Sequence, residues 1–172
     1  MEKRTIQDQT TLPVFLWADE AQNFLHEHDA EYQATARSSR IATVYISQNL
    51  PNYYASMGGQ EAGNRVKSFL GTLGTKIFHA NADIDTNQYA STLIGDKSTK
   101  KESDGTSFGK EVNLSFNRHY EFERAVRPEQ FMRLKSGGYS NHGKVDGIMV
   151  WQGNTVIQDR SHAKVAFSQD FR

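Results

Sequence analysis

Val14-Phe-Leu-Trp-Ala-Asp19-Glu20 is the stretch of the sequence that decides the fold. Its apolar run is short and rich in Val and aromatic side chains, which predicts a strand buried on both faces. Two acids follow directly at the carboxyl end of that strand. Open α/β sheets place their ligands at the carboxyl ends of the strands, so Asp19 and Glu20 mark a candidate site.

A second apolar run, residues 41–46, ends at the polar pair Ser47 and Gln48. This run predicts a second buried strand, and Pro51 is predicted to stop regular structure after it. Gln48 is a candidate sensor of a γ-phosphate, because a Gln amide can bond both an attacking water and a phosphate oxygen. The alternative, a Gln that lines a turn, stays open.

Two acids after a buried strand are typical of the Walker B strand of nucleotide hydrolases. In such sites the first acid, here Asp19, reaches Mg²⁺ through the water shell of the ion. The second acid, here Glu20, polarises the water that attacks the γ-phosphate. The alternative is that both acids only open a helix, where negative charge is favourable. Two neighbouring strands that each end in the expected polar group favour the hydrolase.

The rest of the chain alternates strands and helices as far as Gly95, which predicts an α/β fold with a parallel sheet. Helices are expected over 21–39, 60–73 and 83–94, and a third strand over 75–80. A break near His28 and Asp29 in the first helix stays open, and either Asp83 or Asp85 is expected to cap the third. Beyond Gly95 the pattern changes, and a mobile loop rich in Lys, Ser, Asp and Gly is expected over 96–110. The prediction ends with a half-buried strand over 112–117, a helix over 129–134, a strand over 146–151 and a polar tail over 153–172.

The composition bounds the class of function. With 172 residues, 20 Lys and Arg against 20 Asp and Glu, and no Cys, the chain suits one neutral domain. Zero net charge argues against a protein that binds nucleic acid by charge alone. The absence of Cys excludes disulfides, Cys-based zinc sites and thiol nucleophiles. The polar leader over 1–12 lacks the apolar core of a signal peptide.

A Walker A phosphate loop is not found in the sequence. The stretch 105–111 has three residues between its glycines instead of four, and Glu111 stands where Ser or Thr would bind Mg²⁺. In this fold class the phosphate loop precedes the Walker B strand, and 12 residues precede Pro13 here. We therefore expect that this chain does not hold a triphosphate tightly by itself.

Four blocks of the sequence, taken in order, resemble the coupling proteins of type IV secretion and conjugation, the TraG/TraD family. They are 13–22 with its Asp-Glu pair, 44–50 with Gln48, 74–95 with Thr86, Tyr89 and Ser91, and 124–134 with Pro128. Arg37 lies at the place of the family's Arg, before the strand that ends in Gln. The related DNA-pumping FtsK/HerA group shares the first two blocks and stays open as an alternative.

The resemblance implies a membrane-anchored homo-hexameric ATPase with a RecA-like (P-loop NTPase) motor domain, on the cytoplasmic side of the bacterial inner membrane. Such a protein recruits a relaxase–DNA complex and a relaxosome accessory protein. It drives single-stranded DNA or protein toward the secretion channel. Residues 13–152 would be the C-terminal part of that motor, a partial parallel sheet flanked by helices without its Walker A half. ATP and Mg²⁺ would bind the whole motor.

Residue by residue, the resemblance implies that Asp19 serves Mg²⁺, Glu20 activates water and Gln48 senses the phosphate. It implies that Arg37 is an arginine finger that reaches the nucleotide of a neighbouring subunit. Arg124 would be a second contact to the nucleotide or to a neighbour. For Arg37, the residues by themselves leave open a solvated helix face.

Two other classes of function stay open. In the first, the chain is a non-catalytic recognition module that docks a relaxosome or secretion partner through 96–110 and 153–172. In the second, it is an unrelated α/β domain whose acids Asp19 and Glu20 cap a helix.

Overall fold

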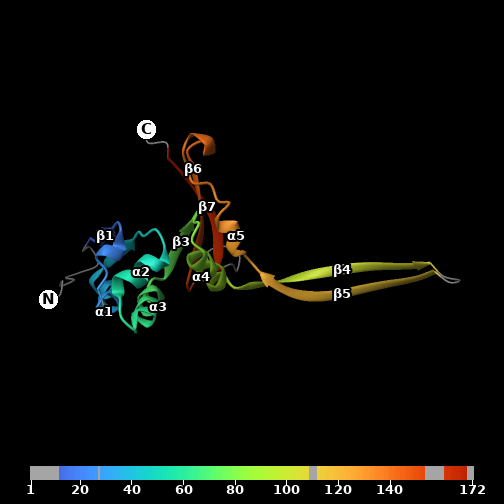
Figure 1. Cartoon of the computed structure of the whole chain (residues 1–172), viewed down its shortest axis with the longest axis horizontal. Coiled ribbons are helices and arrows are strands. Elements are labelled where there is room, and N and C mark those ends of the chain that lie inside the picture. The colour runs from blue at the N-terminus through green and yellow to red at the C-terminus, as the bar shows by residue number, and fades with distance from the viewer. Residues whose placement is uncertain (1–11, 27, 109–111, 154–160, 170–172) are drawn as a thin grey trace.

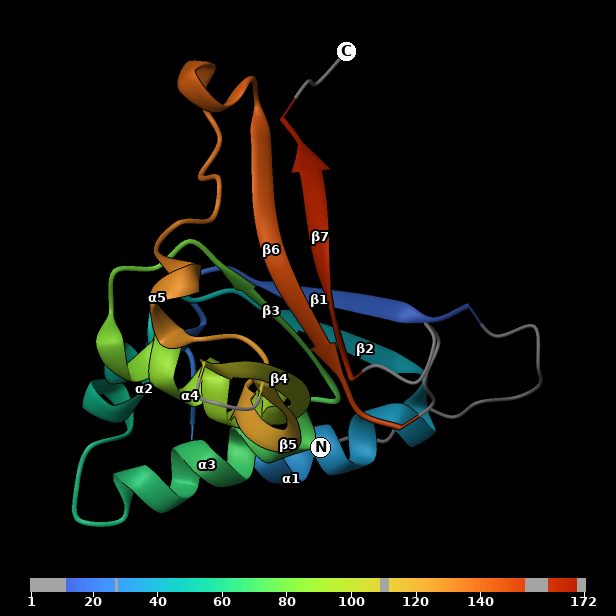
Figure 2. The ribbon, with the colours of Figure 1, turned by 90° about the vertical axis from the view of Figure 1, so that its right-hand side faces the viewer.

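Three separate sheets organise the described part of the chain, and no strand of one sheet pairs there with a strand of another. The computed structural model describes residues 12–26, 28–108, 112–153 and 161–169. The first sheet and three helices form one end of the molecule, and a long hairpin projects from the opposite side (Figure 1). A second pair of strands stands upright between them (Figure 2). The α/β class predicted from the sequence is confirmed.

The first sheet consists of β1 (Val14–Ala18) and β2 (Ile41–Tyr45), which pair in parallel. The predicted neighbouring strands are confirmed, but the prediction that β1 is buried on both faces is wrong. The side chains of Val14, Phe15, Leu16 and Trp17 are 44% to 67% exposed. Among the described residues no third strand joins this sheet, and two strands are too narrow to cover the apolar run of β1.

The first hydrophobic core lies at the carboxyl ends of β1 and β2, where α2 (Leu50–Met57) and α3 (Ala62–Thr72) pack. Its buried members are Ala21, Leu50, Tyr53, Val66, Phe69 and Leu70. The helical segment predicted over 21–39 is interrupted before Asp29, where the sequence allows a break, and it consists of the 3-10 turn η1 (Ala21–Asn23), the helix α1 (Asp29–Ala36) and the 3-10 turn η2 (Arg37–Ser39).

Pro51 does not stop regular structure, contrary to the prediction, because it lies in the first turn of α2. Asn49 caps this helix, with its side-chain oxygen accepting from the Asn52 amide at 2.9 Å. A proline in the first turn lacks only an N–H that has no acceptor within the helix, so it is tolerated there.

The second sheet has the order β3 (Thr75–His79), β6 (Lys144–Trp151) and β7 (His162–Ser168), and both pairs are antiparallel. The predicted parallel arrangement is therefore correct only for β1 and β2. Against this sheet pack α4 (Ile84–Ile94), which Asp83 caps as predicted, and α5 (Pro128–Phe131). The buried members of this second core are Ala90, Ile94, Val126, Phe131, Ile148 and Val150.

The predicted polar tail over 153–172 contains β7, so the prediction of an irregular tail is wrong over 162–168. Residues 154–160 and 170–172 of that tail lie outside the described residues. Of the polar leader predicted over 1–12, only Leu12 is described. Within the described ranges, no helix combines the length and the apolar character needed to cross a membrane.

The long hairpin is built from β4 (Asp96–Phe108) and β5 (Val112–Arg124). The prediction of a loop over 96–110 is wrong over 96–108, where the chain forms β4. The sequence of β4 is polar and has no apolar face, but its backbone groups are paired with those of β5. Residues 109–111 lie outside the described residues. Strands of 13 residues give an arm about 44 Å long, which leaves the body beside α4 and α5 (Figure 1).

The two faces of the base of this arm differ in chemistry. On one face Lys101 bonds Glu121 and lies 3.3 Å from Glu123, and the first of these bonds lowers the pKa of Glu121. On the other face Tyr120 and Phe122 are 69% and 78% exposed. Successive strand residues alternate between faces, so the base presents one face with the ion pairs of Lys101, here called the ion-paired face, and one face with Tyr120 and Phe122, here called the aromatic face, which ends at the ion pair of Asp96 and Arg124.

Candidate functional site

The carboxyl ends of β1 and β2 bring the acid pair next to Gln48. The bonding between the strands continues past their ends: the Ile46 amide donates to the Ala18 carbonyl at 2.9 Å, and the Ala21 amide donates to the Ile46 carbonyl at 2.8 Å. These two bonds fix the turns that follow both strands. The polar groups that the sequence places at neighbouring strand ends are therefore in contact in the structure.

The Glu20 carboxylate is held by two side-chain amides. Gln48 Nε2 donates to Glu20 Oε1 at 2.9 Å, and Gln22 Nε2 donates to Glu20 Oε2 at 2.5 Å. Ser47 Oγ in turn donates to Gln22 Oε1 at 2.8 Å, which orients the Gln22 amide. Gln22 is buried whereas Gln48 is exposed. The buried Gln22 thus fixes the Glu20 carboxylate from inside the protein. Its other contact, Gln48, is exposed, so the Gln48 side of the carboxylate faces solvent.

Sequence reasoning missed the roles of Gln22 and Ser47. Gln22 follows Glu20 by two residues within a 3-10 turn, and no spacing rule marks such a partner in a sequence. The contact depends on the backbone of Glu20, which is left-handed, with φ 50° and ψ 45°. This conformation is uncommon for a residue with a Cβ and costs on the order of 1–3 kcal/mol. Here the two bonds between the strand ends and the two amides on the carboxylate hold it in place.

Tyr53 supports this cluster from the core. Burial raises the pKa of the Tyr53 hydroxyl, which a hydrogen bond with Ser47 partly offsets. The hydroxyl therefore stays neutral at pH 7, and Ser47 lies between the buried Tyr53 and the Gln22 amide.

Asp19 is the residue with which this chain would hold Mg²⁺, through the water shell of the ion. Asp19 is exposed, and its Oδ1 accepts the Glu20 amide at 2.9 Å. In the described part of the chain no group of three or more His, Cys, Asp or Glu side chains is arranged to hold a metal. Mg²⁺ usually keeps several waters and takes one or two carboxylates together with substrate phosphates. The donors present therefore fit an ion that binds together with a nucleotide.

Arg37 lies at the opposite end of the same sheet. It opens η2, directly before β2, and its side chain is exposed. Because β2 has five residues and a strand rises about 3.3 Å per residue, about 16 Å of strand separates Arg37 from the turn that carries Gln48. Arg37 therefore does not serve the Glu20 of its own chain, and its action on a neighbouring subunit stays a prediction.

Arg124 closes β5, and its guanidinium lies 3.3 Å from the Asp96 carboxylate. Asp96 is also its partner in the strand register, so this ion pair joins the two strands where the arm leaves the body. The contact described for Arg124 is thus within the hairpin and not with Glu20 or Gln48. Its contact with a nucleotide stays a prediction.

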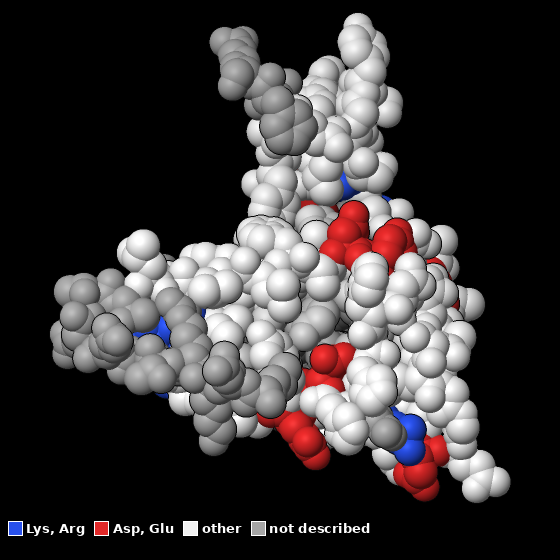
Figure 3. Space-filling view, turned by 90° about the vertical axis from the view of Figure 1, so that its left-hand side faces the viewer, with Lys and Arg blue, Asp and Glu red and all other residues white. Residues whose placement is uncertain are grey.

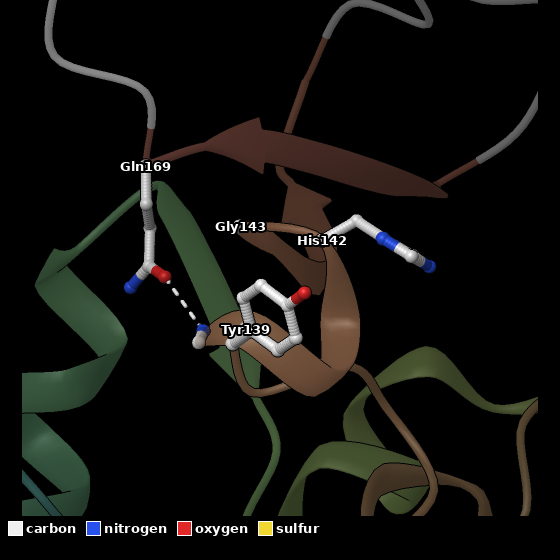
Figure 4. A pocket seen from close by; sticks show the side chains of 5 residues that line it. Tyr139, His142, Gly143 and Gln169 are labelled. Carbon is white, nitrogen blue, oxygen red and sulfur yellow. Dashed lines mark hydrogen bonds between the residues drawn. The ribbon is translucent and has the colours of Figure 1, made fainter.

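A depression of about 470 Å³ adjoins the Glu20 cluster and is lined by Gln22, Asn23, Asn52, Ala55 and Ser56. Another, of about 430 Å³, lies beside the start of β6, where Gln169 faces the turn of Tyr139 and His142 (Figure 4). Gln169 Oε1 accepts the Gly138 amide there at 2.8 Å. Of the residues that line this second depression, the sequence marks only Gln169, as part of the segment 153–172 named for the recognition-module alternative.

The end of the molecule that carries the first sheet is mostly uncharged. Figure 3 shows small groups of Asp and Glu on this side and few Lys or Arg. The exposed apolar residues of β1 contribute to this surface. Such a surface is suited to contact with another protein segment, whereas a bound polyphosphate there needs cations from elsewhere.

The fold of the chain is similar to that of part of a solved conjugative coupling protein. A solved structure of the bacterial conjugative coupling protein TrwBdeltaN70, in an unbound monoclinic form, matches with a TM-score of 0.59 and 16% sequence identity. The match covers 94% of this chain and 33% of that protein, so the chain spans about a third of its length. The predicted RecA-like fold is confirmed by this likeness.

The family follows from the sequence. The family model for the TraM recognition site of TraD and TraG matches residues 13–136, more than half of the chain. This protein therefore belongs to the TraG/TraD family of conjugative coupling proteins. No curated protein matches the sequence.

Proposed function

We propose that this chain is the C-terminal, acid-bearing part of the motor of a conjugative coupling ATPase. The motor would link a relaxase–DNA substrate to a type IV secretion channel and drive the transfer of single-stranded DNA. It would act as a homo-hexamer at the cytoplasmic side of the inner membrane. The observation that carries the proposal is the 2.9 Å bond between Gln48 and Glu20 at the ends of two parallel strands.

Each residue of the cluster has a defined task in ATP hydrolysis. The Glu20 carboxylate accepts a proton from the attacking water, and the Gln22 amide keeps that carboxylate aimed out of the turn. The exposed Gln48 amide exchanges its bond to Glu20 for bonds to the water and a phosphate oxygen. Asp19 would hold Mg²⁺ through the water shell of the ion. The ion would supply positive charge that stabilises the negative charge of the phosphates.

A strand with a phosphate loop from outside the described residues would complete the site. The edge of β2 opposite β1 and the edge of β3 opposite β6 have no partner strand among the described residues. A strand parallel to β2 at these edges would join the two sheets and place its phosphate loop beside Gln48. The Lys of that loop would add a cation to a face on which Figure 3 shows few Lys or Arg.

Asp19→Asn tests the proposal in a motor polypeptide that contains this chain together with its phosphate loop (the assembled motor). Loss of the carboxylate should raise the Mg²⁺ concentration for half-maximal ATP hydrolysis by about 10-fold or more, the effect typical of outer-shell ligands. The control is Asp85→Asn, which removes an exposed acid in the first turn of α4. A steady-state magnesium titration that is the same for Asp19→Asn and the wild type would contradict the proposal.

The arm favours a second function of the same chain, the recognition of a relaxosome accessory protein. The matching family model is described as the TraM recognition site of TraD and TraG. The aromatic face of the arm offers Tyr120 and Phe122, which are exposed and lie on a projecting element (Figure 1). Exposed aromatic side chains are enriched among the anchors of protein interfaces.

Substitution of both anchors, Tyr120→Ser with Phe122→Ser, is expected to weaken binding of a TraM-type accessory protein by at least about 30-fold, since a single anchor residue contributes about 2 kcal/mol or more. Lys97→Ser, on the ion-paired face, is the control and should leave the affinity within about 2-fold. Isothermal titration calorimetry with the whole chain measures both. An affinity that is equal in all three proteins would exclude the aromatic face as the contact.

A further inference from the structure

The segment that carries Gln48 is held in place by side chains from the turn between β3 and α4. Asn81 Nδ2 donates to the Gln48 carbonyl at 2.7 Å, and the buried Leu50 amide donates to Thr86 Oγ1 at 2.9 Å. These bonds lie on either side of Asn49. The backbone of the candidate sensor is therefore fixed by residues 33 and 36 positions further along the chain.

Asn81, in the turn between β3 and α4, and Thr86, in the first turn of α4, are linked to each other through Asp83. The Thr86 hydroxyl donates its hydrogen to Asp83 Oδ2 at 2.6 Å. A lone pair of the same oxygen, Oγ1, accepts the Leu50 amide. Asn81 Oδ1 accepts the Asp83 amide at 2.8 Å, and Asn87 Nδ2 donates to the Asn81 carbonyl at 2.9 Å. Thr86 and Asn87 are 9% and 3% exposed. Hydrogen bonds that link several partly buried polar groups favour a single geometry.

The helix behind this turn is anchored at its other end. Ser91, fully buried, donates through Oγ to the Val126 carbonyl at 2.7 Å. Ala90 and Ile94 belong to the second hydrophobic core. The turn that holds the Gln48 segment is thus continuous with a helix that is packed in the second hydrophobic core.

Capping of α4 does not account for this arrangement. The cap is complete with Asp83, whose Oδ2 accepts the Thr86 amide at 2.8 Å. The bonds from Asn81 to Gln48 and from Leu50 to Thr86 leave α4 and reach the turn after β2. The simpler alternative is that Thr86 only satisfies a buried amide of α2, which would affect stability and not catalysis.

We propose that Thr86 and Asn81 are positioning residues for Gln48. They hold the backbone of the Gln48 segment in the position from which the Gln48 side-chain amide reaches the Glu20 carboxylate and the attacking water. This inference rests on the proposed ATPase function. It predicts that loss of the Thr86 hydroxyl releases the Gln48 segment without removing any group that touches the nucleotide.

Thr86→Val removes the hydroxyl and keeps the shape, and Thr86→Ser keeps the hydroxyl. In this chain, the Val variant should speed hydrogen exchange of the Leu50 amide by about 10-fold relative to other α2 amides, and shift the NMR signals of the Gln48 side-chain amide. In the assembled motor it should lower kcat by about 10-fold with KM for ATP within 2-fold. Thr86→Ser should restore both readouts, and Thr92→Val, an exposed change in α4, should alter neither.

The outcomes separate the two claims. Hydrolysis that is unchanged in Thr86→Val but lost in Glu20→Gln would overturn the positioning role and leave the ATPase function standing. Hydrolysis that persists in Glu20→Gln would overturn the ATPase function. In that case the NMR signals of the Gln48 side-chain amide test the positioning role. Unchanged signals in Thr86→Val would overturn it, and shifted signals would support it.

Discussion

Glu20→Gln is expected to lower ATP hydrolysis by the assembled motor at least about 100-fold, because an amide cannot take the proton of the attacking water. The shape of the side chain is kept, and one of its amide-facing oxygens remains for Gln48 or Gln22. Nucleotide affinity should therefore stay within a few-fold. Steady-state kinetics and a fluorescent-nucleotide titration measure the two effects.

A matched control for this change is Glu31→Gln on α1, whose carboxylate is 83% exposed beside His28. It removes the same charge from the surface and should leave hydrolysis within about 2-fold. A Glu20→Gln motor that hydrolyses ATP at the rate of the Glu31→Gln motor would show that Glu20 is not the base. An equal loss of nucleotide binding and hydrolysis would instead indicate that the turn after β1 has rearranged.

The parts of the fold that local chemistry determines are predictable from the sequence. The cap at Asp83 and the end of α4 at Gly95, which has φ 86°, follow from side-chain capping and the conformational freedom of glycine. β1 and β2 follow from their apolar runs. The burial of β1 is not predictable from its own residues, because it depends on how many strands join the sheet. β4 was missed because its polar sequence is paired through the backbone of β5.

Some residues of the candidate site are also predictable from the sequence, and others are not. Asp19, Glu20 and Gln48 are marked by their positions directly after apolar runs, and the structure brings Glu20 and Gln48 into contact. Gln22, Asn81 and Thr86 carry no such mark, since their bonds depend on a left-handed turn and on contacts far apart in the sequence. The roles assigned to Arg37 and Arg124 require a neighbouring subunit or a nucleotide and stay predictions.

Phe69→Ala is expected to lower the free energy of unfolding by about 3–5 kcal/mol, because it opens a cavity at the centre of the first core. Phe69 is fully buried, meets the Tyr45 ring edge-on with centroids 5.0 Å apart, and lies 6.1 Å from the Tyr53 ring. The free energy of unfolding of a domain is only about 5–15 kcal/mol, so this loss is a large fraction of the total stability. Urea unfolding followed by circular dichroism measures it, and Phe69→Leu provides a variant with a smaller loss of about 1 kcal/mol.

Phe131→Ala is the informative comparison, since Phe131 is equally buried but belongs to the second core. Both changes should cost similar stability. Only Phe69 shares its core with Ala21, which follows Glu20, and with Leu50, which lies two residues after Gln48. Hydrogen exchange at the Ala21 and Leu50 amides should therefore increase in Phe69→Ala beyond its increase in Phe131→Ala. Equal increases in both variants would show that one cooperative unit, and not the first core, supports the Glu20–Gln48 contact.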